Sequence, residues 1–136
     1  KIALGRSDTT HIKAGIILSK LGFQIIATKG TSNFLKKHNI KAASVNKVFE
    51  GRPNITDLLI DGKIHLVFNT TEGSQSIEDS KEIRSIALKG KIPYFTTAAG
   101  CNAAARAIQV KSKKKTNVYK IQDLIEYNTK RIFDIP

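Results

Sequence analysis

Short apolar runs alternate with segments of helical spacing from one end of the chain to the other. The apolar runs are rich in β-branched and aromatic residues and predict strands at residues 2–4, 23–27, 43–48, 64–68 and 92–95. The segments between and after them predict helices at residues 9–21, 31–38, 54–60, 77–89 and 98–110. Such alternation is typical of a parallel sheet with right-handed crossovers. We therefore expect a three-layer α/β domain, in which helices cover both faces of a five-stranded, Rossmann-like parallel sheet.

The predicted helices carry residues that are suited to start and stop them. Asp8 or Thr9 is expected to cap the first helix, and Asn54 the third. Thr31 or Ser32 is expected to cap the second helix. Glycines follow the first, third and fourth helices, at positions 22, 62 and 90. A glycine there adopts the left-handed conformation that ends a helix at little steric cost.

The length of 136 residues suits one domain with one core, and we treat residues 1–136 as a single unit. Residues 111–136 are only weakly patterned. Within them, Val118–Ile121 is expected to form a short edge strand, and Asp123–Tyr127 a final helix. The chain has no methionine and begins with a lysine, which is a poor context for removal of a start methionine. We therefore expect it to be a piece of a longer polypeptide.

The chain carries a formal net charge of +12, and a balance of this kind attracts polyanions. The excess is mostly lysine, spread along the chain, with a dense run at residues 111–115. The few aromatic residues do not alternate with basic ones, as a stacking platform for nucleic acid would require. We therefore favour a solvated basic surface over a nucleic-acid site, and keep a basic nucleic-acid or partner-binding domain as an alternative.

The sequence shows neither an export signal nor an apolar run of the roughly 20 residues that a spanning helix needs. The single cysteine cannot form an internal disulfide, which fits a reducing compartment. We therefore expect a cytoplasmic protein without a membrane partner.

The residues that most often carry catalysis or bind metals form no constellation. The histidines, at positions 11, 38 and 65, are far apart in the sequence and lack neighbours at metal-ligand spacing. Cys101 lies in an alanine-rich helix and is expected to be a small buried residue. A Walker A loop and a dinucleotide-type glycine fingerprint are both missing. We therefore expect no catalytic residue, metal site or cofactor in this domain.

Polar residues follow each predicted strand and should meet at one rim, because parallel strands all end at the same edge of their sheet. Thr28-Lys29-Gly30-Thr31 follows the second strand and leads into a helix, where free amides and the helix dipole favour a phosphate or carboxylate. Asn69-Thr70-Thr71 follows the fourth strand, and Lys47 supplies a cation near the end of the third. Together these groups predict an anion-binding rim.

Several of these segments occur in an order and spacing that are specific. They are Ala27-Thr28-Lys29-Gly30-Thr31, Val45 to Pro53 (VNKVFEGRP), Asn69-Thr70-Thr71, Ile77-Glu78-Asp79-Ser80 and Ile83-Arg84. They resemble the methylglyoxal-synthase-like domain at the C-terminus of the carbamoyl-phosphate synthase large subunit. The resemblance spans about Ile2 to Ile125.

This resemblance implies a five-stranded parallel sheet and a regulatory site for a nucleotide monophosphate, with UMP as an inhibitor and IMP as a second ligand. Other branches of the family take UTP and PRPP, or N-acetylglutamate. The family pattern places the phosphate on Thr28, Thr31 and Lys47, with Asn69 and Thr71 completing that end. It places the ribose and base near Val48, Ile55, Asp79 and Ser80.

The resemblance also implies that the domain is non-catalytic. The parent chain would be the glutamine-hydrolysing ligase, which uses ATP with Mg or Mn outside this domain. Its partners would be the remainder of the large subunit, the glutaminase small subunit and, in many such enzymes, further copies of itself.

A divergent methylglyoxal synthase is the alternative of the enzyme class. Such an enzyme needs a glycine-rich loop ending in a catalytic aspartate after the third strand, where this chain has Glu50-Gly51-Arg52-Pro53. It also has an aspartate-proline step where this chain has Asn69-Thr70-Thr71. One position departs from the regulatory pattern as well. Bacterial relatives have a phosphate-facing lysine after the first strand, and this chain has Asp8. We expect Asp8 to cap the first helix and face away from the ligand.

Overall fold

The computed structural model describes residues 1–5, 9–70, 74–115, 118, 120–123 and 125. Its strands are β1 Ile2–Gly5, β2 Ile25–Thr28, β3 Ala42–Val45, β4 Leu66–Asn69 and β5 Tyr94–Phe95. Its helices are α1 Thr9–Lys20, α2 Lys29–Lys37, α3 Ile55–Ile60, α4 Ser74–Lys89 and α5 Ala98–Lys113, with a 3₁₀ turn, η1, at Val48–Glu50.

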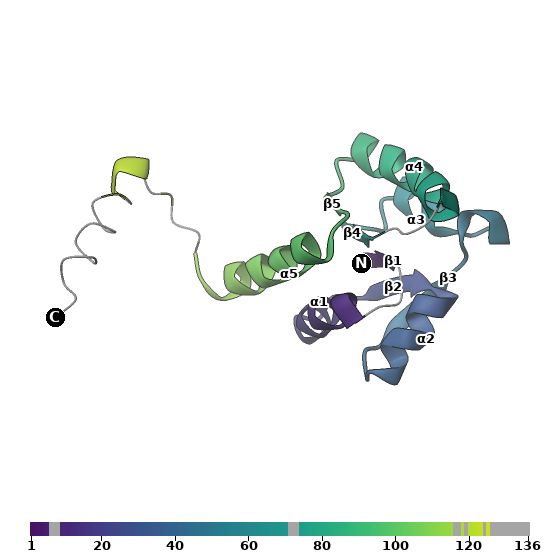
Figure 1. Cartoon of the computed structure of the whole chain (residues 1–136), viewed down its shortest axis with the longest axis horizontal. Coiled ribbons are helices and arrows are strands. Elements are labelled where there is room, and N and C mark those ends of the chain that lie inside the picture. The colour runs from purple at the N-terminus through teal and green to yellow at the C-terminus, as the bar shows by residue number, and fades with distance from the viewer. Residues whose placement is uncertain (6–8, 71–73, 116–117, 119, 124, 126–136) are drawn as a thin grey trace.

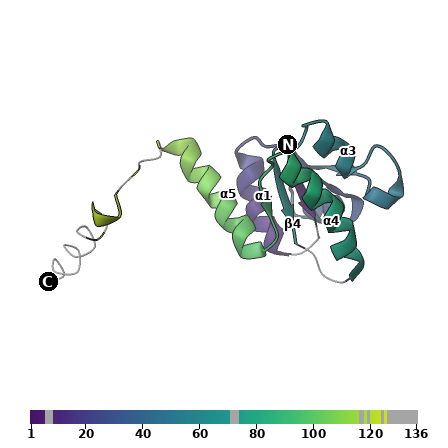
Figure 2. The same ribbon diagram turned by 90° about the horizontal axis from the view of Figure 1, so that it is seen from above.

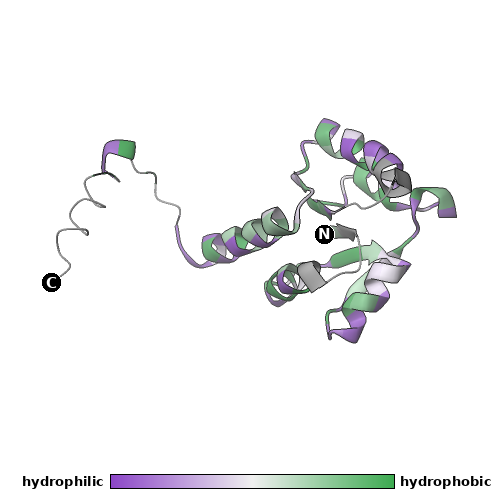
Figure 3. Ribbon diagram, in the orientation of Figure 1, coloured by the Kyte–Doolittle hydropathy of each residue, from purple (hydrophilic) through white to green (hydrophobic). Residues whose placement is uncertain are grey.

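The strands form one parallel sheet in the order β3-β2-β1-β4-β5. Figure 1 shows α1, α2 and α5 on one side of this sheet and α3 and α4 on the other. Strand β2 is mostly green, and so apolar, in Figure 3, as a parallel strand covered on both faces should be, and it ends in the polar Thr28. The predicted five-stranded α/β architecture is therefore confirmed.

Successive residues of each strand enter two separate cores, because side chains alternate between the faces of a sheet. Ile2, Ile25 and Leu66 are neighbours in register and belong to the core under α1, α2 and α5. The next residue of each strand belongs to the core under α3 and α4; these are Ala3, Ile26 and Val67. Each helical layer thus has its own apolar surface to cover.

Helix α2 begins earlier than the sequence predicted, at Lys29, and Thr28 occupies its N-cap position. The expectation that Thr31 or Ser32 caps this helix is therefore wrong. Both residues are buried in the first turn, and the Ser32 Oγ donates a hydrogen bond of 2.9 Å to the Ala42 carbonyl oxygen. This bond ties α2 to β3, so the Ser32 hydroxyl serves tertiary packing rather than capping.

Further boundaries differ from the sequence prediction. Strands β2, β4 and β5 each begin two residues later than predicted, and α5 extends to Lys113. Strand β3 ends at Val45 rather than Val48, because the chain turns into η1 over Val48–Glu50. Helix α4 begins at Ser74 rather than Ile77. Among the predicted stops, Gly22 and Gly62 have positive φ angles of 83° and 65°, which confirms the conformation expected after a helix. Gly90 does not, because the next residue, Lys91, has the positive φ angle of 53°.

The C-terminal edge strand is not formed. Val118 and Lys120 are outside any strand, and residues 121–123 are helical. Figures 1 and 2 show these residues apart from the sheet, so they have no strand edge with which to pair. Val118 is accordingly 96% exposed and Ile121 72%. The predicted helix over Asp123–Tyr127 lies mostly outside the described residues.

Helix α5 packs beside α1, and Cys101 and Ala105 are its buried residues. Cys101 is fully buried, which confirms its prediction as a core residue. None of the helices in the described part of the chain is long and apolar enough to cross a membrane.

Helix α3 is only six residues long and is held at its start by a reciprocal cap. The Asn54 Oδ1 accepts hydrogen bonds from the backbone N–H of Thr56 at 3.0 Å and of Asp57 at 3.3 Å. In return, the Asp57 carboxylate accepts the Asn54 N–H at 2.8 Å. Isolated helices this short are unstable, so α3 depends on its cap and on its packing.

We predict that Asn54→Ala lowers the free energy of unfolding by about 1–2 kcal/mol, because a buried N-cap loses its acceptor. Asn54→Asp retains that acceptor and should lose much less. Urea denaturation of the two variants measures the difference. Equal losses for both would show that the cap contributes nothing beyond side-chain volume.

Candidate functional site

The strand order reverses at β1, which lies between β2 and β4 in the centre of the sheet. The chain runs outward from β1 through β2 to β3, and then returns to the other side of β1 through β4 to β5. In open α/β sheets a crevice forms at such a switch point, beyond the carboxyl ends of the strands. Residues 6–8 after β1 and 71–73 after β4 lie outside the described residues.

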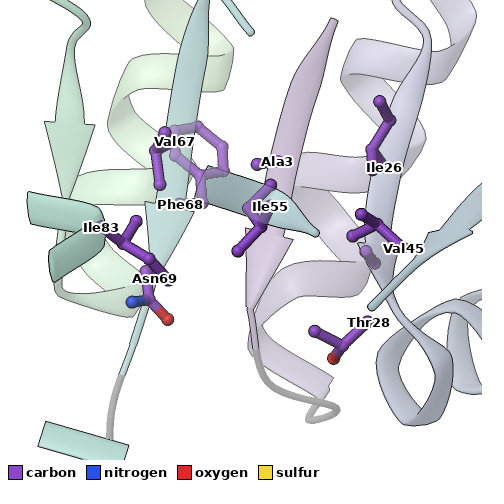
Figure 4. Close-up of a pocket in the computed structure, with 10 residues that line it drawn as sticks. Ala3, Ile26, Thr28, Val45, Ile55, Val67, Phe68, Asn69 and Ile83 are labelled. Atoms are coloured by element: carbon purple, nitrogen blue, oxygen red, sulfur yellow. The ribbon is translucent and has the colours of Figure 1, made fainter. Parts of the chain in front are cut away.

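A hollow of about 70 Å³ lies between the carboxyl half of the sheet and the helices α3 and α4. Figure 4 shows the residues that line it, which are Ala3, Ile26, Ala27, Thr28, Val45, Ile55, Val67, Phe68, Asn69 and Ile83. Its interior is mainly apolar, whereas Thr28 and Asn69 stand at the strand ends. The structure therefore brings three of the predicted site residues, Thr28, Ile55 and Asn69, to one hollow.

The N-terminus of α2 opens beside this hollow. Thr28 has an extended backbone, with φ of −62° and ψ of 158°, and its side chain makes no capping hydrogen bond. The first turn of α2 carries no acidic residue. Its first N–H groups lack partners within the helix, and the helix dipole adds positive charge at this end. An added Cβ at Gly30 would meet no atom within 4 Å, so this backbone is accessible. The arrangement is one that binds phosphate or carboxylate groups.

Asn69 is fixed at the opposite side of the hollow by two hydroxyls. Its Nδ2 donates to Ser80 Oγ at 3.0 Å and to Tyr94 Oη at 2.8 Å. The guanidinium of Arg84 lies 5.7 Å from the centre of the Tyr94 ring. Both N–H bonds of Asn69 are thus used inside the protein, and Oδ1 remains as an acceptor. In this arrangement the Asn69 side chain can accept a hydrogen bond from a ligand hydroxyl or N–H. To donate to a phosphate, Nδ2 would have to break its hydrogen bond with Ser80 or with Tyr94.

Tyr94 was missed by the sequence analysis. It lies within β5, whereas the rule applied to the sequence selected residues that follow strands. Ile83 was named there only as part of a motif, yet it lines the hollow from α4. The only available signal for Tyr94 was a polar hydroxyl in an otherwise apolar strand.

Lys47 and Val48 lie where β3 leads into η1. Lys47 is exposed, and its backbone N–H donates to Glu50 Oε2 at 2.8 Å. No salt bridge joins Lys47 to a carboxylate among the described side chains. Val48 is half-buried and packs against the core under α3 and α4. The lysine side chain is therefore available near the same rim.

The remaining predicted site residues are less accessible or not described. Thr31 is 3% exposed in the first turn of α2, and Ser80 is 4% exposed and held against Asn69. Asp79 lies in α4, but its side chain is outside the described part of the structure. Thr71 and Asp8 also lie outside the described residues. Thr31 and Ser80 are therefore buried next to the site and do not line its open surface.

Two of the histidines lie away from this rim, and the side chain of the third, His11, is outside the described part of the structure. His38 follows α2 at its far end, where its Nδ1 lies 3.0 Å from the Phe34 carbonyl oxygen. His65 precedes β4 and lies at the amino edge of the sheet. The described residues contain no group of three His, Cys, Asp or Glu side chains that could hold a metal ion.

Comparison with known proteins identifies the family. The family model described as "MGS-like domain" matches residues 12–96. The "Carbamoyl phosphate synthase large chain" of Brucella suis biovar 1 is 42% identical over 106 residues, which cover 78% of this chain and 9% of that protein. The protein of the same name from Mesorhizobium japonicum is 41% identical over 137 residues, covering 93% of this chain and 12% of that protein.

A third relative is described as "Carbamoyl phosphate synthase large chain, C-terminal section", from Methanopyrus kandleri. It is 44% identical over 108 residues, covering 79% of this chain and 20% of that protein. This chain thus spans about a tenth of the length of the first relatives. The match of the family model to most of the chain, together with the parallel five-stranded fold, shows that the chain belongs to the MGS-like domain family.

Proposed function

We propose that this chain is the effector-binding domain of a carbamoyl-phosphate synthase large chain, and that it binds a nucleotide monophosphate such as UMP or IMP. The observation that carries the proposal is the N-terminus of α2, which has neither a side-chain cap nor an acidic residue in its first turn. It opens beside a hollow with an apolar interior. A phosphate joined to a partly apolar group fits both features.

In this proposal the phosphate binds to the first amides of α2 and to the Thr28 hydroxyl, with Lys47 as the cation. Thr31 supports this turn from within, and Thr71 completes the phosphate end. Asn69, which the family pattern assigns to that end, offers an acceptor in its present arrangement. We therefore assign its Oδ1 to a hydroxyl or N–H of the ligand.

The ribose and base lie over the apolar part of the hollow. Ile55 lines it from α3, and Val48 packs into the adjoining core. The family pattern assigns Asp79 and Ser80 of α4 to the border of the same space, and the Ser80 Oγ accepts a hydrogen bond from Asn69 Nδ2, which lines the hollow. Apolar walls with a few placed polar groups are the usual composition of small-ligand sites.

The domain itself catalyses nothing in this proposal and needs no cofactor. ATP with Mg or Mn would act in other parts of the parent ligase. The partners of this domain would be the rest of the large subunit, the glutaminase small subunit and further copies of the same chain. Its location would be the cytoplasm. The ligand regulates the parent only if it binds two states of the large chain with different affinities.

We predict that UMP or IMP binds to the folded 136-residue chain with a measurable heat at millimolar concentration. Isothermal calorimetry tests this, with circular dichroism as the control for folding. A folded protein that gives no heat with either nucleotide would refute the ligand assignment. Methylglyoxal formed from dihydroxyacetone phosphate, or tight oligonucleotide binding at physiological salt, would instead support one of the two alternatives.

Lys47→Ala should weaken nucleotide binding about tenfold, since a charge-assisted contact contributes roughly 1.5 kcal/mol. Lys41→Ala is the matched control, because Lys41 is also exposed but precedes β3 at the other edge of the sheet. Nucleotide titrations should show weaker binding for Lys47→Ala and unchanged binding for Lys41→Ala, while the two variants have the same melting temperature. A lower melting temperature for Lys47→Ala alone would mean that Lys47 is structural.

Helix α1 begins at Thr9, directly after Asp8 in the sequence. We predict that Asp8→Ala lowers the free energy of unfolding by about 0.5–2 kcal/mol and leaves nucleotide affinity unchanged, because the carboxylate caps the helix. Urea denaturation and calorimetry on the same variant test both parts. Tighter binding by Asp8→Lys with unchanged stability would contradict the capping role, because it would place this side chain at the phosphate.

A further inference from the structure

A second hollow lies at the amino edge of the sheet, opposite the effector rim. Its volume is about 370 Å³, and it is lined by Leu59, Ile60, Gly62, Ile64, His65, Gly90, Lys91 and Ile92. These residues come from the end of α3, the turn before β4 and the turn between α4 and β5. Ile60, at the end of α3, is 66% exposed and contributes an apolar side chain to its lining. We call this hollow the amino-edge groove.

The first residue of the chain lies at the border of the amino-edge groove. The His65 N–H donates to the Lys1 carbonyl oxygen at 2.8 Å, and the Lys1 amino group lies 2.9 Å from His65 Nδ1. His65 is itself a lining residue of the groove. Residues joined to Lys1 in a longer chain would therefore reach the groove within a few residues.

The groove has one lysine in its lining and a second lysine nearby. Lys91 is exposed on it, and Lys63 stands beside it in the turn after α3. Lys63 is paired with Asp61 at 2.8 Å, whereas no salt bridge joins Lys91 to another described side chain. A segment that presents apolar side chains together with a carboxylate would complement this surface.

The amino-edge groove also shares its supporting helices with the effector hollow. Ile55 at the start of α3 lines the effector hollow, and Leu59 and Ile60 at its end line the groove. In α4, Ile83 lines the effector hollow, and Gly90 directly after the helix lines the groove. The same two helices therefore link the linings of the two hollows.

We infer that the amino-edge groove is the surface on which this domain docks against the segment that precedes Lys1 in its parent large chain. This inference rests on the proposed function, which places the chain in such a parent. The docked segment buries Ile60 and pairs a carboxylate with Lys91. Helices α3 and α4 then connect the nucleotide at the carboxyl rim to the rest of the large chain.

Lysine acylation with mass spectrometry tests this inference on the 136-residue chain and on the intact large chain. Lys91 should react about tenfold more slowly in the large chain, where docking covers it, than in the 136-residue chain. Lys37, exposed at the end of α2 on the other face, serves as the reference. Equal reactivity of Lys91 in the two proteins would overturn the inference.

A pair of variants makes the test specific to the groove. Ile60→Asn should restore the reactivity of Lys91 in the large chain and, because it adds no charge beside Lys91, leave it unchanged in the 136-residue chain. Val110→Asn replaces an aliphatic side chain by the same amide at a 58% exposed site on α5 and should alter neither. Protection of Lys91 in the 136-residue chain that grows with concentration would also overturn the inference, because a second copy would then occupy the groove.

Calorimetry with UMP and IMP on the same large-chain preparations separates the two proposals. A large chain that binds nucleotide while Lys91 stays reactive refutes the docking surface and retains the effector site. A large chain that protects Lys91 without binding either nucleotide refutes the effector site and retains the docking surface.

Discussion

Strand β1 is paired on both of its edges, with β2 and with β4, and its side chains enter both cores of the domain. Ile2 is fully buried on one face and Ala3 is 5% exposed on the other. Because β1 is central, the reversal of strand order falls on it, and its carboxyl end marks the rim at which we propose that the nucleotide binds. Its amino end joins Lys1 to the amino-edge groove. The hollow beside α2 and the amino-edge groove thus lie at the two ends of one strand.

The strands and most helices could be predicted because their signals are local. Strand β2 is a continuous apolar run, and burial on both faces requires that pattern. Asn54 was recognised as a cap because its acceptor role involves only the next three residues. The start of α2 could not be predicted in this way. Ser32 has the chemistry of a cap, but its hydroxyl bonds to Ala42 in the next strand. That bond is tertiary and leaves no signal in the neighbouring residues.

The same distinction applies to the site. Thr28 and Asn69 follow from a topological rule, since parallel strands end at one edge. Tyr94 follows from no such rule, because its hydroxyl is significant only once β5 lies beside β4 and brings it to Asn69. The burial of Thr31 was likewise invisible, because it depends on how α2 packs on the sheet. The sequence predicted that polar residues gather at one rim. Only the structure shows that the Asn69 side-chain N–H groups already donate to Ser80 and Tyr94.

The pairing of β1 with β4 has a consequence for how the domain is made. Ile2 pairs with Leu66, so one edge of β1 has no partner until a segment far along the chain has been synthesised. Until then that edge of β1 stays open, and an open strand edge is the kind of surface on which chains aggregate. Contacts so distant in sequence also slow folding. The pairing of β4 with β1 is therefore the step that closes the edge of the central strand.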